Sequence, residues 1–194
     1  MNLYPLGKAL STGFAKTTFR LEVHGKEHVP KTGGVLLCCN HKSNLDPVIL
    51  GVGCPREVRY MAKEELFKAP AGKWLMESLK VIPVKRGQSD KLALRKGLAV
   101  LQEGEVYGMF PEGTRSKTGE LGEGLGGAGF FALRSNAAIV PSAVIGDYRM
   151  FGKLKLAFGP PISFESAREE KLSSKEATEL IMSKISALIE QYKE

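Results

Sequence analysis

Short apolar runs alternate with segments of helical periodicity along the chain, and this alternation restricts the fold more than any other feature. Runs rich in β-branched and aromatic residues predict strands at residues 19–24, 35–39, 58–61, 81–84, 106–110, 139–144 and 154–158. Apolar residues at helical spacing predict helices at residues 47–51, 70–79, 90–103, 130–136 and 174–193. Strands and helices that alternate in this way build a sheet covered by helices. The sequence therefore predicts an α/β fold with a mixed, mostly parallel sheet flanked by helices.

The length and charge of the chain limit its organisation and its partners. A chain of 194 residues buries about 70% of its unfolded surface in one core, so we expect a single domain over residues 1–194. The net charge of +7 favours anionic partners, such as a lipid surface or a phosphorylated substrate. Nucleic acid is a poor choice, because the basic residues are scattered and no recognition-helix or RNA-binding signature is present.

Cysteine usage argues against disulfide and metal chemistry. Cys38, Cys39 and Cys54 are an odd number without C-x-x-C spacing, which favours a reducing compartment. Because successive strand residues face opposite sides, Cys38 and Cys39 should be small core residues on the two faces of one strand. His24 and His28 have no partners at metal-ligand spacing, so no metal site is expected.

The N-terminal residues 1–18 predict an amphipathic helix. Its apolar positions recur at helical spacing at Leu3, Leu6, Leu10 and Phe14. Two interpretations remain open: the helix packs on its own domain, or it lies in a membrane interface with its apolar face in lipid. No run reaches the roughly 20 apolar residues that a transmembrane helix needs, and the apolar core of a signal peptide is absent.

A histidine and an aspartate follow the strand predicted at residues 35–39. They are His41 and Asp46 in the segment NHKSNLD, residues 40–46. Neutral imidazole accepts a proton from an alcohol near pH 7, and a carboxylate on its other nitrogen orients the ring. Asp46 before Pro47 is also typical of a helix N-cap, which is the purely structural interpretation. Ser43 and Asn44 either order the turn or donate hydrogen bonds to a reacting carbonyl.

Two cationic clusters also follow apolar strands. One is Lys85 and Arg86, and the other is the turn Glu112, Gly113, Thr114 and Arg115. Guanidinium groups bind phosphate oxygens in pairs, and Glu112 suits such a site only if it holds Arg115 or Lys85 in place. Because ligands of open α/β sheets bind at the carboxyl ends of strands, we expect both clusters to share one cleft with His41. This combination predicts a substrate with a hydroxyl at one end and a phosphate at the other.

A glycine-rich segment at residues 124–129 matches the pattern G-x-G-x-x-G. A dinucleotide-binding turn must follow a buried strand, whereas residues 118–123 are polar and interrupted by glycine. We therefore predict a flexible loop here and no dinucleotide.

These motifs resemble those of the 1-acylglycerol-3-phosphate acyltransferases of phospholipid synthesis. Residues 40–46 look like the family's first motif, N-H-x-S-x-x-D, which includes Asn40, and residues 84–87 look like its second. Residues 110–116, FPEGTRS, match its third motif in full, and residues 139–141 resemble its fourth. The resemblance spans about residues 20 to 160 and implies a glycerolipid acyltransferase fold, with a catalytic core at residues 19–194 behind the N-terminal helix.

The resemblance also implies a reaction. His41 would be the general base, Asp46 would orient it, and Pro141 would shape the region near the acyl donor. Lys85, Arg86 and the turn at residues 112–115 would bind the phosphate of lysophosphatidic acid. An acyl group would pass from acyl-CoA or acyl carrier protein to the free 2-hydroxyl, without any cofactor, at an anionic membrane surface on the cytoplasmic face. The alternatives are an acyltransferase for another lysophospholipid or glycerol 3-phosphate, a thioesterase, and a non-catalytic binder of anionic lipid.

Overall fold

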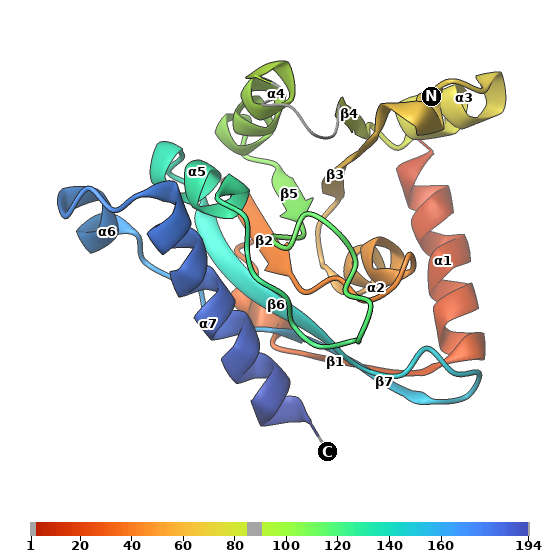
Figure 1. Ribbon diagram of the computed structural model, residues 1–194. Coiled ribbons are helices and arrows are strands. Elements are labelled where there is room, and N and C mark those ends of the chain that lie inside the picture. The colour runs from red at the N-terminus through yellow and green to blue at the C-terminus, as the bar shows by residue number, and fades with distance from the viewer. Residues whose placement is uncertain (1–2, 85–90, 194) are drawn as a thin grey trace.

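The strands form one mixed sheet, as predicted. The computed structural model describes residues 3–84 and 91–193, so Lys85 and Arg86 lie outside the described residues. Seven strands pair in the order β1-β7-β6-β2-β5-β3-β4, and every pair is parallel except β6 with β7 (Figure 1). Their bounds are β1 Arg20–His24, β2 Val35–Cys39, β3 Val58–Lys63, β4 Ile82–Val84, β5 Val106–Met109, β6 Ala138–Gly146 and β7 Lys153–Phe158.

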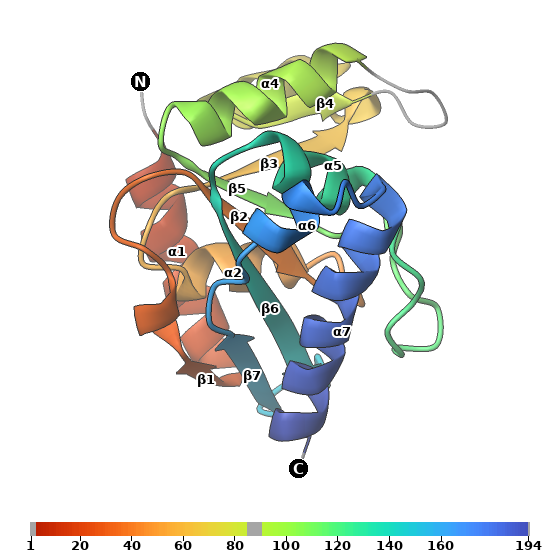
Figure 2. The same cartoon turned by 90° about the vertical axis from the view of Figure 1, so that its left-hand side faces the viewer.

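Helices cover both faces of the sheet. On one face lie α4 (Lys91–Gln102), α5 (Gly127–Arg134), α6 (Glu165–Glu169) and α7 (Ser174–Tyr192), as Figure 2 shows. On the other face lie α1 (Tyr4–Thr18) and α2 (Asp46–Gly53). Next to β3 and β4 lie α3 (Pro70–Ser78) and the short 3₁₀ helix η2 (Glu64–Phe67), and a second 3₁₀ helix, η1 (Lys26–His28), follows β1. The predicted α/β architecture is confirmed.

The central strand β2 is fully buried, and its residues contribute to two separate cores. Cys38 packs in the cluster under α4, α5 and α7, whereas Cys39 packs in the cluster under α1 and α2. Both thiols have no exposed surface, which confirms the prediction of small core residues on opposite faces. Burial raises the pKa of both groups, because a thiolate would lose its hydration there.

The predicted flexible loop at residues 124–129 is wrong in its second half, because α5 begins at Gly127. A Cβ atom on Gly129 would lie 2.0 Å from the carbonyl oxygen of Ser174, so only glycine allows this close approach to α7. The Gly129 N–H donates to Thr178 Oγ1 at 2.9 Å. The glycines therefore serve helix packing. A capping box begins α7, since Ser173 and Glu176 exchange both hydrogen bonds.

The N-terminal helix α1 packs on α2 with one side and leaves its apolar stripe in solvent. Ala15 is fully buried, and Lys8 Nζ donates to the Cys54 carbonyl at 2.6 Å. Leu6, Leu10 and Phe14 remain 60%, 68% and 47% exposed. Within the described ranges, no helix combines the length and apolar character that crossing a membrane requires.

Loops from several strands meet at one edge of the sheet. The five strands β2 to β6 all run in the same direction. Their carboxyl ends therefore lie at the same edge of the sheet. The segments that follow β2, β5 and β6 bring residues 40–46, 110–116 and 147–148 together there.

Candidate active site

The structure brings His41 and Asp46 together at the end of β2. His41 Nδ1 lies 2.8 Å from Asp46 Oδ2. An ionised carboxylate only accepts hydrogen bonds, so Nδ1 carries the proton and Nε2 of the neutral ring holds a free lone pair. Among the described residues Nε2 has no hydrogen-bond partner, and His41 forms part of a cavity wall. This arrangement suits a general base whose reacting nitrogen is Nε2.

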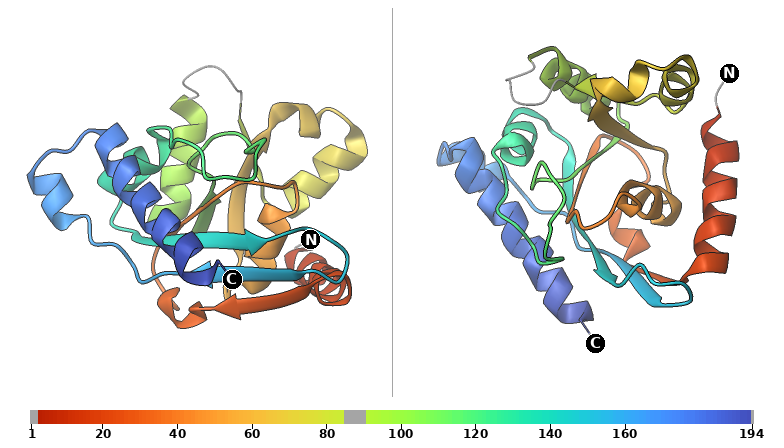
Figure 3. Two further views of the ribbon diagram at one scale, coloured as in Figure 1. Left: turned by 60° about the horizontal axis from the view of Figure 1, so that its bottom comes forward. Right: turned by 45° about the vertical axis from the view of Figure 1, so that its right-hand side comes forward.

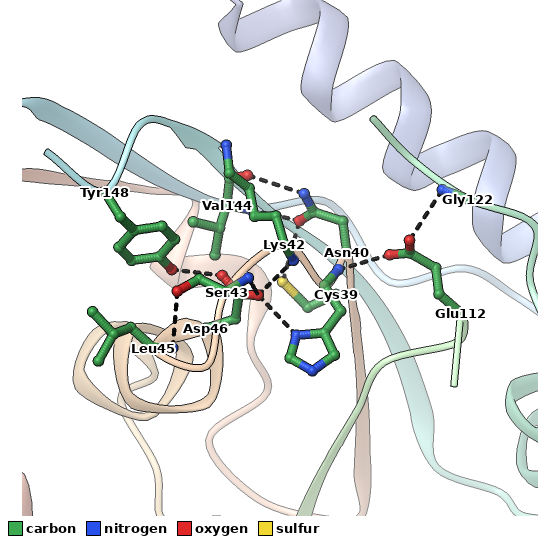
Figure 4. A network of polar contacts seen from close by, with 11 residues as sticks. Cys39, Asn40, Lys42, Ser43, Leu45, Asp46, Glu112, Gly122, Val144 and Tyr148 are labelled. Carbon is green, nitrogen blue, oxygen red and sulfur yellow. Dashed lines mark hydrogen bonds and ion pairs between the residues drawn. The ribbon is translucent and has the colours of Figure 1, made fainter. Parts of the chain in front are cut away.

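The carboxylate of Asp46 is fully buried and accepts four hydrogen bonds. Besides His41, the backbone N–H groups of Lys42 and Ser43 donate to Oδ2 at 2.7 and 2.6 Å (Figure 4). The hydroxyl of Tyr148 donates to Oδ1 at 2.6 Å. The N-cap of α2 is Leu45 rather than Asp46, because the carboxylate turns back to bind the amides that precede it. The helix-cap interpretation of Asp46 is therefore wrong.

Glu112 holds the backbone of His41 through a hydrogen bond. Its Oε1 accepts from the His41 N–H at 2.7 Å, and its Oε2 accepts from the Gly122 N–H at 3.0 Å (Figure 4). The side chain is 6% exposed, and no described residue forms an ion pair with it. Of the two cations that Glu112 was expected to hold, Arg115 forms no ion pair with it, and Lys85 lies outside the described residues. The Ser116 N–H donates to the His41 carbonyl at 2.8 Å, so the loop after β5 binds both sides of the His41 backbone.

Phe110 fixes the plane of the imidazole. The rings of His41 and Phe110 stack with centroids 4.2 Å apart and an interplanar angle of 22°. From the sequence, Phe110 was expected only to end a strand and to begin the third motif. Its position directly after β5, at the edge where His41 lies, is the signal that could have identified it.

The turn after Phe110 presents Thr114 and Arg115 to solvent. Gly113 adopts a left-handed φ of 67°, and its N–H donates to the Phe110 carbonyl at 3.0 Å. A Cβ atom there would approach Leu125 Cδ1 to 2.5 Å, so glycine suits the turn on two counts. Thr114 and Arg115 are exposed next to Ser116, whose amide binds His41. Two of the predicted polar clusters thus meet, and Lys85 and Arg86 lie outside the described residues.

An apolar cavity of about 800 Å³ begins beside the imidazole. Its walls come from α1, α2, β3, α3 and β5, and the imidazole is one of its few polar groups. The lining includes Leu10, Val48, Met61, Leu66, Met76 and Tyr107. A cavity of this size and character fits a long apolar ligand group.

Comparisons with known proteins point to one family. The family model for acyltransferases matches residues 20–145. The chain is 36% identical over 151 residues to a 1-acyl-sn-glycerol-3-phosphate acyltransferase of Bacillus subtilis, covering 73% of each chain. It is 30% identical to the enzyme of the same name from Borreliella burgdorferi, over 69% of this chain and 54% of that one.

The chain belongs to the acyltransferase family. The resemblance that the motifs indicated is thereby confirmed. The crystal structure of the 1-acyl-sn-glycerophosphate acyltransferase PlsC from Thermotoga maritima shares the fold, with a TM-score of 0.75 and 20% identity over 98% of this chain and 80% of that one.

Four further residues of the acyltransferase motifs have distinct positions. Buried Asn40 exchanges two hydrogen bonds with the backbone of Val144 in β6, at 3.0 and 2.8 Å, and so ties the site loop to the sheet. Ser43 Oγ accepts from the Leu45 N–H at 3.2 Å, which orders the turn, and Asn44 lines the cavity. Pro141 lies inside β6 opposite Cys38 and is not part of the cavity lining.

Tyr148 is a site residue of this acyltransferase that sequence reasoning missed. It follows β6, and its ring packs edge-on against Phe19 with centroids 5.6 Å apart. Burial and the nearby charge of Asp46 raise the pKa of the Tyr148 phenol, so the group stays protonated and donates to Asp46. The rule that pointed to His41, a polar residue after a parallel strand, also applies to Tyr148.

Proposed function

We propose that this acyltransferase moves a fatty acyl group from acyl-CoA or acyl carrier protein to the 2-hydroxyl of 1-acylglycerol 3-phosphate, which gives phosphatidic acid. The observation that supports this most directly is the Asp46-bound imidazole of His41 at the wall of an apolar cavity. The two relatives compared above, which are 36% and 30% identical to this chain, are both named 1-acyl-sn-glycerol-3-phosphate acyltransferase. The chemistry needs a base for the hydroxyl and space for an apolar chain, and His41 and the cavity suit these two needs.

The reaction begins when His41 Nε2 accepts the proton of the lysophosphatidate hydroxyl. The hydroxyl oxygen attacks the thioester carbonyl, and the resulting tetrahedral intermediate expels the thiolate. The imidazolium then returns a proton to the departing sulfur. Asp46 stabilises the imidazolium, because the carboxylate accepts the Nδ1 proton throughout. Only an acyl group and a proton move, so the reaction requires no cofactor.

The phosphate of the acceptor is proposed to bind the exposed cation Arg115, together with Lys85 and Arg86. Arg115 stands one residue before Ser116, whose N–H binds the His41 carbonyl. A phosphate held there stays close to the base, so the neighbouring glycerol hydroxyl is brought toward Nε2. Glu112 supports this arrangement indirectly, since it fixes the loop that carries Arg115 against His41.

The apolar cavity is proposed to hold an acyl chain, and α1 is proposed to contact the membrane. Leu10 and Leu66 line the cavity and are 68% and 52% exposed, so an apolar rim surrounds its opening. Trp74 on α3 is 57% exposed. Such a rim suits a peripheral enzyme on the anionic, cytoplasmic face of a membrane, where lipid chains enter from the bilayer.

The test uses purified protein and a thioester with a labelled acyl group, with and without 1-acylglycerol 3-phosphate. We expect label in phosphatidic acid and thioester loss only when the acceptor is present. Loss of thioester that is independent of the acceptor would identify a thioesterase. Label in another lysophospholipid, or in glycerol 3-phosphate, would replace the proposed acceptor, and no turnover with any acceptor would support a lipid binder.

A further inference from the structure

A turn beside the N-terminal helix presents two large apolar side chains to solvent. Residues 147–152 connect β6 to β7, and Met150 and Phe151 at its tip are 72% and 64% exposed. Single exposed apolar residues are common on protein surfaces, but adjacent ones that extend an apolar surface mark a contact site.

The backbone at Phe151 is unfavourable for the residue that it carries. Its φ is 59°, in the left-handed region that bulky residues rarely adopt. The Phe151 N–H donates to the carbonyl of Thr18 at 2.7 Å, which fixes the turn against the end of α1. Glycine or asparagine would take this conformation at lower cost. The turn itself therefore gives no reason for a phenylalanine, and its exposed ring points to a role outside the folded chain.

Two cations lie side by side at the base of the turn. Arg20 in β1 and Lys153 in β7 are register partners on neighbouring strands, and both are exposed. Like charges directly opposite each other destabilise a sheet. Within the described part of the chain neither side chain forms an ion pair. An anionic surface would relieve this repulsion.

The turn lies against the end of α1, the helix that carries the exposed apolar stripe. Figure 3 shows, in its right-hand view, the β6–β7 turn at the lower end of α1. The Arg20 N–H donates to the Gly152 carbonyl at 2.9 Å, so the turn, the end of α1 and the start of β1 are joined by hydrogen bonds. Leu6 and Phe14 are exposed on α1, and exposed Phe151 is hydrogen-bonded to Thr18 at the end of that helix.

We propose that the turn at residues 147–152 is a second bilayer contact, in which Met150 and Phe151 insert among lipid chains while Arg20 and Lys153 bind anionic head groups. This inference rests on the proposed function, because it assumes that the acceptor is drawn from a membrane. Tyr148 in the same turn holds Asp46, so the contact lies next to the catalytic edge of the sheet. The two contacts, α1 and the turn, would together orient the cavity opening toward the lipid.

The test measures binding of the full chain to vesicles of phosphatidylcholine, alone or mixed with phosphatidylglycerol in equal parts, by sedimentation. The double variant Met150→Gln, Phe151→Asn should bind mixed vesicles at least about tenfold more weakly, since two large apolar side chains leave the lipid. Its Tm should be equal or higher, because asparagine tolerates the left-handed φ. The control Leu180→Gln changes a residue that is 41% exposed on α7 and should bind like the wild type.

Charge removal gives a second readout. Arg20→Gln and Lys153→Gln should each weaken binding to mixed vesicles by about fivefold and leave binding to pure phosphatidylcholine unchanged. If the turn variants bind like the wild type while Leu6→Gln with Phe14→Gln abolishes binding, lipid contact is confined to α1 and the inference is overturned. Weaker vesicle binding by the turn variants would support the inference whether or not the protein is active. If the wild-type protein also transfers no acyl group to dispersed acceptor, the proposed function is rejected.

Discussion

Glu112 and His41 are 71 residues apart in the sequence, and the carboxylate of the first accepts the backbone N–H of the second at 2.7 Å. The other carboxylate oxygen binds the Gly122 N–H, so one buried side chain joins the loop after β2 to the loop after β5. A motif residue that resembled part of a phosphate site thus holds the backbone of His41, the proposed base. This distinction leads to different kinetic outcomes for neighbouring residues.

Glu112→Gln should lower kcat far more than it raises the acceptor KM. The two carboxylate oxygens of Glu112 accept hydrogen bonds from the backbone N–H groups of His41 and Gly122. In glutamine an NH₂ group replaces one of these oxygens. One hydrogen bond is therefore lost, and two donors face each other. We expect a free energy of unfolding lower by about 1–3 kcal/mol and a kcat lower by about 10- to 100-fold. Steady-state kinetics and urea unfolding measure these effects. A variant with normal kcat and a raised acceptor KM would return Glu112 to the phosphate site.

His41→Ala should lower kcat by about 10²–10⁴-fold, because the variant lacks the proposed general base. The backbone of residue 41 keeps its hydrogen bonds to Glu112 and Ser116 in the variant, so the loop should remain in place. Circular dichroism and thermal unfolding control for folding. An alanine variant that retains full turnover would exclude His41 from the mechanism.

Arg115→Ala should act on the acceptor and spare the donor. The side chain is exposed, and its removal leaves the hydrogen bond between Ser116 and His41 intact. We expect the acceptor KM to rise by about tenfold or more, with a kcat within about twofold of the wild type. Lys117→Ala, two residues further on in the same exposed loop, is the matched control. Equal acceptor KM values for both variants would contradict a phosphate site at Arg115.

Much of the fold could be predicted from the sequence, because its signals are local. The strands at residues 35–39 and 106–109 are short apolar runs, and the capping box of α7 is a contact within four residues. The short α6 was missed, since five residues are too few to show helical periodicity. The start of α5 at Gly127 was missed because glycines there favour close contact with α7, a reason that only tertiary packing supplies.

The sequence predicted which residues meet at the candidate site, but it did not predict their hydrogen-bond partners. His41, Asp46 and the turn at residues 112–115 share the end of parallel strands, and a known rule places such ends together. Which partner each polar group selects depends on atoms from distant segments. The sequence therefore could not show that Glu112 binds a backbone N–H, or that the hydroxyl at position 148 binds Asp46.

Tyr148→Phe tests the last of these contacts. It removes the donor to Asp46 Oδ1 and keeps the ring against Phe19. A hydrogen bond to a charged group contributes about 1.5–3 kcal/mol, so kcat should fall by up to about 10- to 100-fold with little change in either KM. Tyr192→Phe, on the distant end of α7, is the control. A normal kcat in Tyr148→Phe would show that the three remaining donors are enough to position Asp46.

The buried thiols should make the protein less stable in alkali. Burial raises the pKa of Cys38, Cys39 and Cys54 in the folded chain, while the unfolded chain keeps a pKa of about 8.5. Below the unfolded value both states hold the protons and stability is complete. As pH rises above it, only the unfolded state loses them, so the free energy of unfolding falls by about 1.4 kcal/mol per pH unit per thiol.

Urea unfolding from pH 8 to pH 10, with a reductant present, measures this slope. Cys38→Ala should lower the slope by up to about 1.4 kcal/mol per pH unit, a limit approached about one unit above the unfolded pKa, whatever the variant costs in absolute stability, because one titrating group disappears from the unfolded state. The native thiols should also resist iodoacetamide at pH 8, since the thiolate is the reactive form and burial disfavours it. An unchanged slope in Cys38→Ala, or rapid alkylation of the folded chain, would mean that these thiols ionise as readily in the folded chain as in the unfolded one.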